Sequence, residues 1–304
     1  LLFNIYLNDI FYFLDDNMLA SYADDNTPYA IGKNVDIVIT KLSQNTETLL
    51  QWFKDNYFKM NIEKCHLLLS TFNDDMTANV NGINIHGVES VKLLGVKIDN
   101  KLKFKEHISS LCNKASLKLH ALARISHLMT KDKLRTLMKA FIESQFGYCP
   151  LLWMFHSRKL NNRINKLHER ALRLVYKNEQ LTFDELLTLD NSFRIHHRNL
   201  QKLAIEMFKV INDLSPKFMK SIFQSRGHSY NFRTILPFQG ENIHTVYNGT
   251  ETISFRGPKI WALVPNEIKN SKNLQIFKNK IKQWTPSGCT CRMCKVFVPN
   301  YGFL

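Results

Sequence analysis

The chain has 304 residues, 44% of them hydrophobic, so it is long and apolar enough to bury a core and divide into two or three subdomains. The sequence shows neither a run of about 18 apolar residues nor a signal peptide, so we expect an intracellular protein without a membrane span. The formal net charge is +15, yet residues 1–100 hold 7 basic and 13 acidic side chains, whereas residues 101–180 hold 17 and 5. This distribution predicts cation binding by the first block and phosphate binding by the second, with an ordinary solvated basic surface as the alternative.

The first predicted element is a hairpin whose turn carries Asp24 and Asp25. Its flanks are apolar enough for buried strands, and the sequence Asp-Asp-Asn suits a tight turn. Hard cations such as Mg²⁺ prefer carboxylate oxygens, so the pair is a candidate divalent-metal site. The alternative interpretation is a solvated turn without function. Asp15 and Asp16, just before the hairpin, predict a polar loop.

The segment after this hairpin predicts one helix and several strands. Apolar residues over 36–58 have helical spacing, with Asp36 available as the N-cap, and this helix should pack under a sheet. The apolar run 65–70 predicts a buried strand. Residues 79–85 predict a hairpin because they contain Asn-Gly, a strong turn signal, and residues 90–98 predict further strands.

From Phe104 onward the apolar residues recur at helical spacing, which predicts a core-facing stripe on each of several helices. Two later helices are predicted over 194–213 and 271–284, and residues 225–258 predict a long loop with one or two short strands. The opposite faces of the earlier helices carry the side chains expected to bind nucleic acid phosphates: Lys114, Lys118, Arg124, Lys131, Lys133, Arg135, Arg163, Lys166, Arg170 and Arg173.

The six cysteines form a scattered group and a clustered group, and a disulfide framework is not expected in a long chain without a secretory signal. The scattered ones are predicted to be small core residues: Cys65, Cys112 and Cys149. The clustered ones have the close spacing that thiolate ligands of zinc need: Cys289, Cys291 and Cys294. A closed zinc site takes four ligands, and the candidates for the fourth are His228, His244 and Cys149, with an unliganded tail as the alternative. His196 and His197 are instead expected on a basic helical surface.

Several further motifs accompany the acidic turn in a definite order. They occupy residues 1–10, 22–25, 52–65, 93–99, 148–153, 171–173, 255–261 and 301–304, and include Tyr22-Ala23-Asp24-Asp25, Leu93-Leu94-Gly95-Val96-Lys97-Ile98-Asp99 and Phe255-Arg256-Gly257-Pro258-Lys259-Ile260-Trp261. In order and spacing they resemble reverse transcriptases of non-LTR (LINE-type) retrotransposons, from the second half of the polymerase domain onward. The resemblance covers essentially the whole chain.

The resemblance implies an α+β fold, in which a partial polymerase palm, an antiparallel sheet with helices, precedes a mostly α-helical thumb and C-terminal region. The expected divisions are a partial palm, a primer-grip-like β-hairpin region, a basic helical thumb, a helical and loop C-terminal region and a Cys-rich tail, over residues 1–75, 76–104, 105–180, 181–285 and 286–304.

The activity implied is RNA-directed DNA synthesis from deoxynucleoside triphosphates, with an RNA template, a DNA primer and two Mg²⁺ ions. Asp24 and Asp25 would bind Mg²⁺, with Tyr22 and Ala23 lining the primer end. Lys64 would face the triphosphate, although it could equally be a solvated lysine at a strand edge. The remaining site implied is a primer grip, for which an ordinary bulge glycine is the alternative: Leu94 and Gly95.

The resemblance also implies limits on this chain. The family holds its metals with a further aspartate from an earlier strand, and Leu1 corresponds to a position after that strand, so we expect a fragment that does not catalyse alone. The alternative function is a nucleic-acid-binding remnant without catalysis, and an unrelated metal-dependent hydrolase is disfavoured. The parent element would act as a cytoplasmic and nuclear ribonucleoprotein; the sequence leaves its oligomeric state open.

Overall fold

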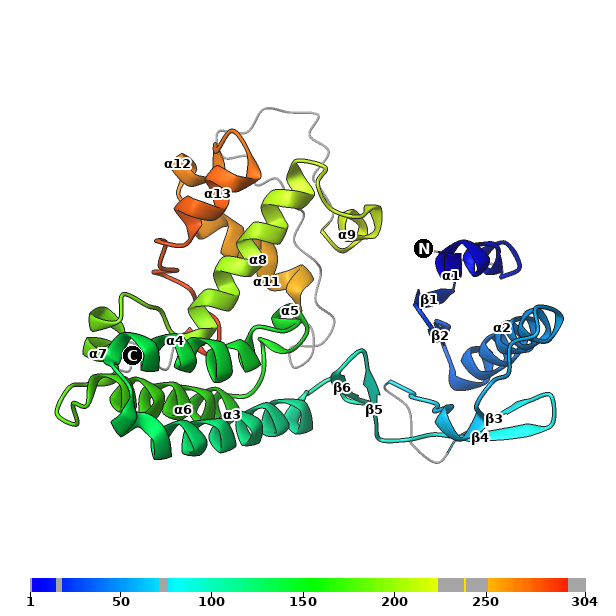
Figure 1. Ribbon diagram of the computed structural model, residues 1–304. Coiled ribbons are helices and arrows are strands. Elements are labelled where there is room, and N and C mark those ends of the chain that lie inside the picture. The colour runs from blue at the N-terminus through cyan, green and yellow to red at the C-terminus, as the bar shows by residue number, and fades with distance from the viewer. Residues whose placement is uncertain (1, 15–17, 71–75, 224–237, 239–250, 295–304) are drawn as a thin grey trace, which may run out of the picture. The chain divides into compact units, whose positions relative to one another are not determined.

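The computed structural model describes residues 2–14, 18–70, 76–223, 238 and 251–294, and these divide into two compact units. Unit 1 is Leu1–Phe104 and unit 2 is Lys105–Leu304. Small antiparallel sheets and one long helix make up most of unit 1, and helices make up unit 2 (Figure 1). The predicted α+β class is therefore confirmed.

Three hairpins and a long helix form the framework of unit 1. Each described sheet has two antiparallel strands, β1 with β2, β3 with β4 and β5 with β6. The elements are α1 Leu2–Tyr6, the 3₁₀ turn η1 Asn8–Tyr12, β1 Leu19–Tyr22, β2 Asp25–Pro28, α2 Val35–Asp55, the 3₁₀ turn η3 Ile62–Lys64, β3 Thr77–Val80, β4 Ile83–His86, β5 Ser90–Leu93 and β6 Val96–Asp99.

The second hairpin confirms the Asn-Gly turn. Asn81 and Gly82 both have positive φ, 50° and 80°, which is the conformation that a two-residue type I′ turn requires. Leu94 and Gly95 form the corresponding turn between β5 and β6, with φ of 45° and 82°. Leucine is costly in this left-handed region, whereas glycine is not.

Helix α2 lies at the centre of unit 1. Its N-cap is Asn34, whose Oδ1 accepts the Ile37 N–H at 2.9 Å; the predicted cap Asp36 is wrong, because it already lies in the first turn. The second half of α2 buries Leu49 and Trp52 in a cluster with α1, η1 and β1. A separate apolar cluster forms along its first half.

The predicted strand over 65–70 is wrong. Leu67 and Leu69 are buried, as the apolar run indicated, but they pack in the cluster beside Val38 of α2. Their backbone makes a single isolated bridge, from Leu67 to Gly87. Leu67 and Leu69 are thus buried by packing on α2, without a ladder of hydrogen bonds to a neighbouring strand.

The end of unit 1 is organised by Asp99. Its Oδ1 accepts the backbone N–H groups of Lys101 and Lys103 at 3.2 and 3.0 Å, and its Oδ2 accepts that of Phe104 at 2.6 Å. Leu102 and Phe104 both have positive φ, 51° and 52°, so the segment is held in a conformation that these residues rarely adopt alone.

In unit 2, α3, α4 and α6 pack against one another as a three-helix bundle, and α6 also contacts α7 and α8. The elements are α3 Lys105–Ile125, η4 Ser126–Leu128, α4 Lys131–Phe141, η5 Glu143–Phe146, α5 Pro150–Trp153, α6 Arg158–Tyr176, α7 Phe183–Leu189, α8 Ile195–Ile211, α9 Lys217–Ile222, α11 Ile253–Leu263, α12 Asn266–Lys269 and α13 Leu274–Ile281. The helices predicted from Phe104 onward are therefore present.

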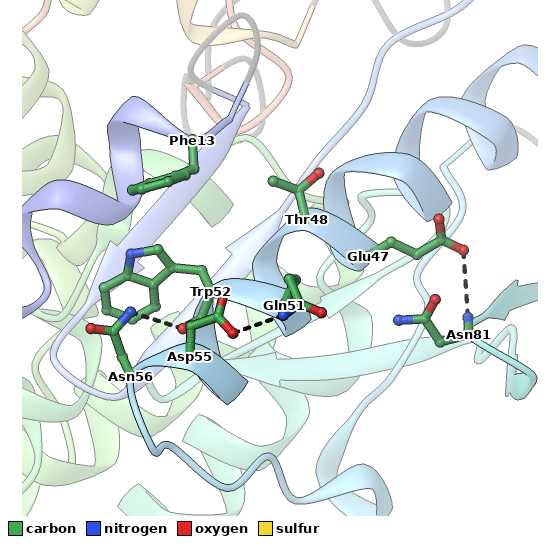
Figure 2. Close-up of a pocket in the computed structure, with 8 residues that line it drawn as sticks. All are labelled: Phe13, Glu47, Thr48, Gln51, Trp52, Asp55, Asn56 and Asn81. Atoms are coloured by element: carbon green, nitrogen blue, oxygen red, sulfur yellow. Dashed lines mark hydrogen bonds between the residues drawn. The ribbon is translucent and has the colours of Figure 1, made fainter.

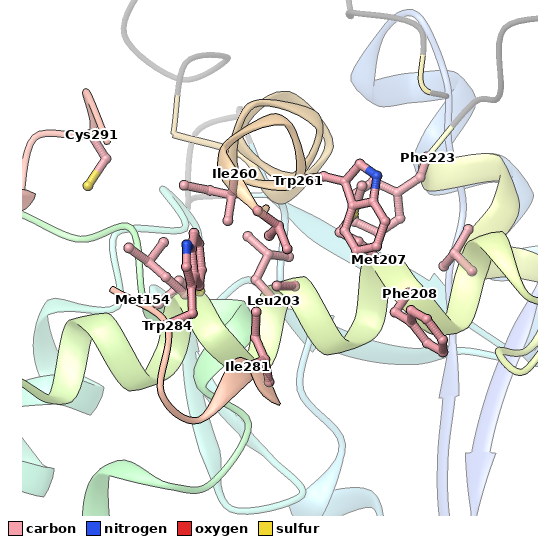
Figure 3. Packing of buried hydrophobic residues seen from close by; sticks show 14 of the residues in the cluster. Met154, Leu203, Met207, Phe208, Phe223, Ile260, Trp261, Ile281, Trp284 and Cys291 are labelled. Carbon is pink, nitrogen blue, oxygen red and sulfur yellow. The ribbon is translucent and has the colours of Figure 1, made fainter. Parts of the chain in front are cut away.

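The main apolar cluster of unit 2 surrounds α8 (Figure 3). Helices α11 and α13 pack on α8, and the rings of Phe208 and Phe277 stack with centroids 4.3 Å apart. Trp261 of α11 also stacks with Phe277, with ring centroids 5.9 Å apart. Cys291 and Trp284 belong to the same cluster, so the segment after α13 is part of the core.

The long loop predicted over 225–258 is wrong at its end, and residues 225–237 and 239–250 lie outside the described residues. Helix α11 begins at Ile253, with Thr252 Oγ1 accepting the Phe255 N–H at 3.3 Å. Gly257 lies where α11 crosses the core, and a Cβ there would be 2.6 Å from the Phe223 ring. The sequence Arg256-Gly257-Pro258 therefore predicts loop wrongly. The glycine allows close packing of α11 on the core, and the proline lies inside the helix.

A buried carboxylate, Glu143, joins three helical elements of unit 2. Its Oε1 accepts from His168 Nε2 at 3.0 Å, and its Oε2 pairs with Arg198 Nη1 at 2.5 Å. Burial alone would raise the pKa of Glu143, but these two hydrogen bonds outweigh it and lower the pKa to about 2. Burial lowers the pKa of His168, so His168 donates as a neutral imidazole and Arg198 carries the compensating charge.

Candidate functional site

The two predicted metal ligands lie at the tip of the first hairpin. Tyr22 at the end of β1 is opposite Asp25 at the start of β2, so Ala23 and Asp24 form a two-residue turn. Both carboxylates are exposed, and the Tyr22 side chain is 68% exposed. The hairpin therefore presents its acids where a cation or a substrate can reach them.

The turn is strained at Ala23. Its φ is 54°, in the left-handed region, which costs about 1–2 kcal/mol for a residue with a Cβ. The chain fixes the turn locally, since Asn26 Nδ2 donates to the Asp24 carbonyl oxygen at 3.4 Å. A residue held in such a conformation at a tight turn is a feature that clusters at functional sites. The prediction that Tyr22 and Ala23 line the primer end stays a prediction.

Asp24 and Asp25 have the donor chemistry for Mg²⁺ but do not form a complete ligand set within the described residues. Carboxylate oxygens suit this hard cation, which commonly takes one or two carboxylates together with water and substrate phosphates. Among the described residues, however, these two acids are not joined by a third His, Cys, Asp or Glu. The residues described thus offer two adjacent carboxylates, fewer protein ligands than a two-metal site needs, and their role as Mg²⁺ ligands stays a prediction.

The other residues predicted around the nucleotide and primer are also exposed. Lys64 ends the short turn η3 and is exposed, so it is not at a strand edge. Leu94 and Gly95 lie at the tip of the third hairpin, where Leu94 is 41% exposed. Neither Leu94 nor Gly95 lies at a β-bulge. The predicted role of Lys64 at the triphosphate, and that of Leu94 and Gly95 at the primer, stay predictions.

Most of the predicted nucleic-acid-binding side chains are exposed on α3, α4 and α6 of unit 2. The helices form one bundle, and Arg163 of α6 donates from Nη2 to Asn113 Oδ1 of α3 at 2.6 Å. Eight of the ten predicted side chains are exposed: Lys114, Lys118, Arg124, Lys131, Lys133, Arg163, Lys166 and Arg170. Their positions suit contact with a polyanion.

The remaining two of the predicted ten, Arg135 and Arg173, are engaged within unit 2. Arg135 Nε and Nη2 contact the Oδ1 and carbonyl oxygen of Asp190, both at 2.6 Å, and Asp190 is buried. Arg173 pairs with Glu169 at 2.7 Å and donates to the Glu179 carbonyl oxygen at 2.7 Å. Arg135 thus joins α4 to the residue that ends α7, and Arg173 joins α6 to the segment that follows it.

A pocket of about 540 Å³ opens beside the second half of α2 in unit 1 (Figure 2). Phe13 and Trp52 form its apolar side, and Gln51 Nε2 donates to Asp55 Oδ1 at 2.8 Å on its polar side. None of its eight lining residues is basic. The pocket therefore lacks the charge that binding a nucleotide phosphate would require, and no predicted site residue lines it.

The structure brings together the clustered cysteines and a histidine from α8. Ligand atoms of His196, Cys291 and Cys294 lie within 4.8 Å of one another, and all three residues are buried. The predicted basic surface at His196 and His197 is therefore wrong, since His196 is 4% exposed and His197 half-buried. His196 is four and seven residues before Leu200 and Leu203, so helical periodicity alone could have placed it on the core-facing side.

The earlier cysteine predictions hold in part. Cys112 is buried and Cys65 is half-buried, but Cys149 is exposed, where it begins α5 with a φ of 41°. The prediction that Cys149 is a core residue is wrong because this strained turn directs it outward. His228 and His244, two of the candidates for a fourth ligand, lie outside the described residues.

The thiol cluster has unusual electrostatics. The neighbouring thiols of Cys291 and Cys294 lower the pKa of Cys289. The same contact with Cys289 raises the pKa of Cys291 to about 11, because a second thiolate would be repelled by the first.

None of the helices in the part of the chain that the structure describes is both long and apolar enough to cross a membrane. No solved structure matches the chain. Residues 1–98 match the family described as reverse transcriptase (RNA-dependent DNA polymerase). A segment of 172 residues, 53% of the chain, is 24% identical to the RNA-directed DNA polymerase from mobile element jockey of Drosophila melanogaster, and spans 18% of that relative. The chain is therefore similar to reverse transcriptases over its first 98 residues, and about half of it is similar to the RNA-directed DNA polymerase of a mobile element.

Proposed function

We propose that this chain supplies part of the catalytic floor and the nucleic-acid-binding helices of an RNA-directed DNA polymerase. The observation that supports this most is the strained two-residue turn that presents Asp24 and Asp25, within residues that match the reverse transcriptase family. The relative in the fruit fly is named for the same activity.

Asp24 and Asp25 would hold Mg²⁺ through their exposed carboxylates. When bound, the metal would activate the primer 3′-hydroxyl and neutralise the triphosphate during in-line transfer. Tyr22 would lie against the terminal primer base, and the cation of Lys64 would stabilise negative charge on the leaving pyrophosphate. A further carboxylate has to join this pair from another part of the polymerase, since the described residues place none beside it.

The exposed basic side chains of α3, α4 and α6 would bind the template–primer duplex through its phosphates. A protein that neutralises about six phosphates loses roughly 10³-fold in affinity between 50 and 200 mM salt. Replacing Lys166 and Arg170 by Glu should therefore weaken binding of an RNA–DNA duplex and reduce the slope of log affinity against log salt by about 2. The same change at the exposed Lys41 of α2 should leave the slope unchanged, and fluorescence anisotropy measures both.

The decisive experiment locates the metal and measures catalysis on the same preparations. Fe²⁺ in place of Mg²⁺ produces radicals that cleave the backbone near its binding site. The proposal expects cleavage close to residues 22–25 that disappears in Asp24→Asn and persists in the control Asp36→Asn, an exposed acid of α2. Primer extension on an RNA template is assayed in parallel.

Extension that requires Mg²⁺ and falls at least about 100-fold in Asp24→Asn would support polymerase activity of this chain itself. Cleavage at the hairpin without extension would support the metal-ligand role and the need for another polymerase segment. Duplex binding with neither extension nor Asp24-dependent cleavage would overturn the proposal and leave the alternative function, a nucleic-acid-binding remnant. The absence of a third ligand near Asp24 among the described residues favours that alternative for the chain alone.

A further inference from the structure

The segment that follows α13 folds back onto the first turn of α8. Gln201 of α8 donates from Nε2 to the Trp284 carbonyl oxygen at 2.8 Å, inside the core. One and a half turns earlier on the same helix, His196 Nε2 lies 3.2 Å from Cys291 Sγ. Two positions on α8 thus contact the same C-terminal segment.

Three cysteine sulfurs meet at the second of these contacts. Cys291 and Cys294 are buried with His196, and the ligand atoms of the three lie within 4.8 Å of one another. Cys289, half-buried, is two residues before Cys291, and both other thiols influence its pKa. The site therefore gathers three sulfurs and one imidazole nitrogen from two segments far apart in the chain.

The backbone around the cysteines is arranged to favour thiolates. The Cys294 N–H donates to Cys291 Sγ at 3.3 Å. Gly288, with a φ of 84°, permits the tight turn immediately before Cys289. Amide donors aimed at sulfur stabilise the negative charge that a metal-binding thiolate carries.

We propose that Cys289, Cys291, Cys294 and the Nε2 atom of His196 bind one structural Zn²⁺ ion. Tetrahedral zinc, with Zn–S of about 2.3 Å and Zn–N of about 2.0–2.1 Å, places two sulfurs about 3.8 Å apart and a sulfur about 3.5 Å from a nitrogen. The observed separation of 3.2 Å between Cys291 Sγ and His196 Nε2, and the separations within 4.8 Å among His196, Cys291 and Cys294, are near this geometry. Cys289 is outside that group of three, so its sulfur would have to move toward the ion.

The types of ligand atom indicate which metal binds at this site and what role that metal has. Three thiolates and one imidazole suit a borderline-soft ion such as Zn²⁺, whereas Mg²⁺ and Ca²⁺ need oxygen ligands. Four protein ligands in a largely buried site leave no open position for water or substrate, so the role is structural. The ion would fasten the C-terminal segment to α8 and complete the core cluster shown in Figure 3. This role is independent of the proposed polymerase function.

The test is metal content of the full chain, expressed with zinc and purified without chelator, measured by plasma mass spectrometry. We expect about one zinc per chain. Cys291→Ser and His196→Asn should each lower the retained zinc at least about tenfold. The matched controls Cys149→Ser and His120→Asn, both at exposed positions, should keep it.

A second measurement covers the case in which a variant does not fold. In the wild-type chain, Co²⁺ should give the visible bands of a tetrahedral site with thiolate charge-transfer absorption. A chelator should at the same time increase hydrogen exchange over residues 284–294 and the first turn of α8. A wild-type chain that takes up neither metal, or a six-coordinate Co²⁺ spectrum, would overturn the proposal. Zinc that remains in Cys291→Ser would overturn it, and zinc that remains in His196→Asn would overturn the assignment of the fourth ligand.

Discussion

The buried carboxylate of Glu143 should make unit 2 sensitive to acid in a way that one substitution can isolate. Its side chain is 6% exposed, and its pKa falls from 4.5 to about 2 because His168 and Arg198 stabilise the ionised form. Each unit of pKa corresponds to about 1.36 kcal/mol, so ionised Glu143 contributes on the order of 3 kcal/mol to the free energy of unfolding. A depressed carboxyl pKa stabilises the fold above pH 4.5, and the contribution is lost as pH falls toward 2.

Glu143→Gln removes this titration with little change in shape. At pH 7 the variant should be less stable than the wild type by about 3 kcal/mol, and by pH 3 the difference should shrink to less than half. Urea unfolding followed by tryptophan fluorescence is suitable, since Trp153, Trp261 and Trp284 all belong to unit 2. Glu179→Gln, at an exposed position, is the control and should change stability by less than about 0.5 kcal/mol.

The outcome that would refute this reasoning is a difference that stays constant between pH 7 and pH 3. It would mean that glutamine disturbs packing and that the ion pair with Arg198 contributes nothing that depends on charge. A difference at pH 7 below about 1 kcal/mol would show instead that burial cancels the two hydrogen bonds.

Three further predictions concern residues whose roles only the structure shows. Gly257→Ala should lower the free energy of unfolding by about 1–3 kcal/mol despite the higher helix propensity of alanine, because its Cβ would clash with the Phe223 ring. Adding Phe223→Leu should recover part of this loss in thermal unfolding. A Gly257→Ala variant as stable as the wild type would disprove the close contact. Asp99→Ala should accelerate amide hydrogen exchange at residues 101, 103 and 104, and unchanged rates would show that its three hydrogen bonds are not maintained. Arg135→Ala should lower the free energy of unfolding, measured with urea, by about 2 kcal/mol. Lys133→Ala should lower the affinity for duplex and change the free energy of unfolding by less than about 0.5 kcal/mol. Equal effects of the two variants on stability would contradict the assignment of a packing role to Arg135 and an exposed role to Lys133.

Local signals in the sequence were sufficient where one interaction determines the structure. The turn at Asn81-Gly82 is dictated by two residues that tolerate positive φ, and the helices of unit 2 follow from apolar periodicity. The strand predicted over 65–70 is wrong because an apolar run indicates burial but not the packing partner, and here the partner is α2. The N-cap of α2 was misplaced by two residues because Asn34 and Asp36 are both good caps.

The candidate sites depended on information that a linear pattern does not carry. The acidic turn could be predicted because its two carboxylates are adjacent in the chain, but no local signal joins Cys291 to His196, which lies 95 residues earlier. Arg135 and Lys133 looked equivalent as basic helical residues, and only the position of Asp190 separates a packing role from an exposed one. The spacing of residues in the sequence thus indicated which side chains could bind a metal or a phosphate, whereas the fold determines which of them lie close together.

The carboxylate of Asp99 fixes where the chain can usefully be divided. Because Phe104 donates its amide to that carboxylate, the residues from 99 to 104 belong structurally to unit 1, although they adjoin the first helix of unit 2. A truncation made at residue 99 or 100 would separate Leu102 and Phe104 from the Asp99 carboxylate, whose hydrogen bonds hold this segment in its left-handed conformations. Separate expression of the two units should therefore place the cut between Phe104 and Lys105, and a protease that requires an extended substrate should spare this stretch.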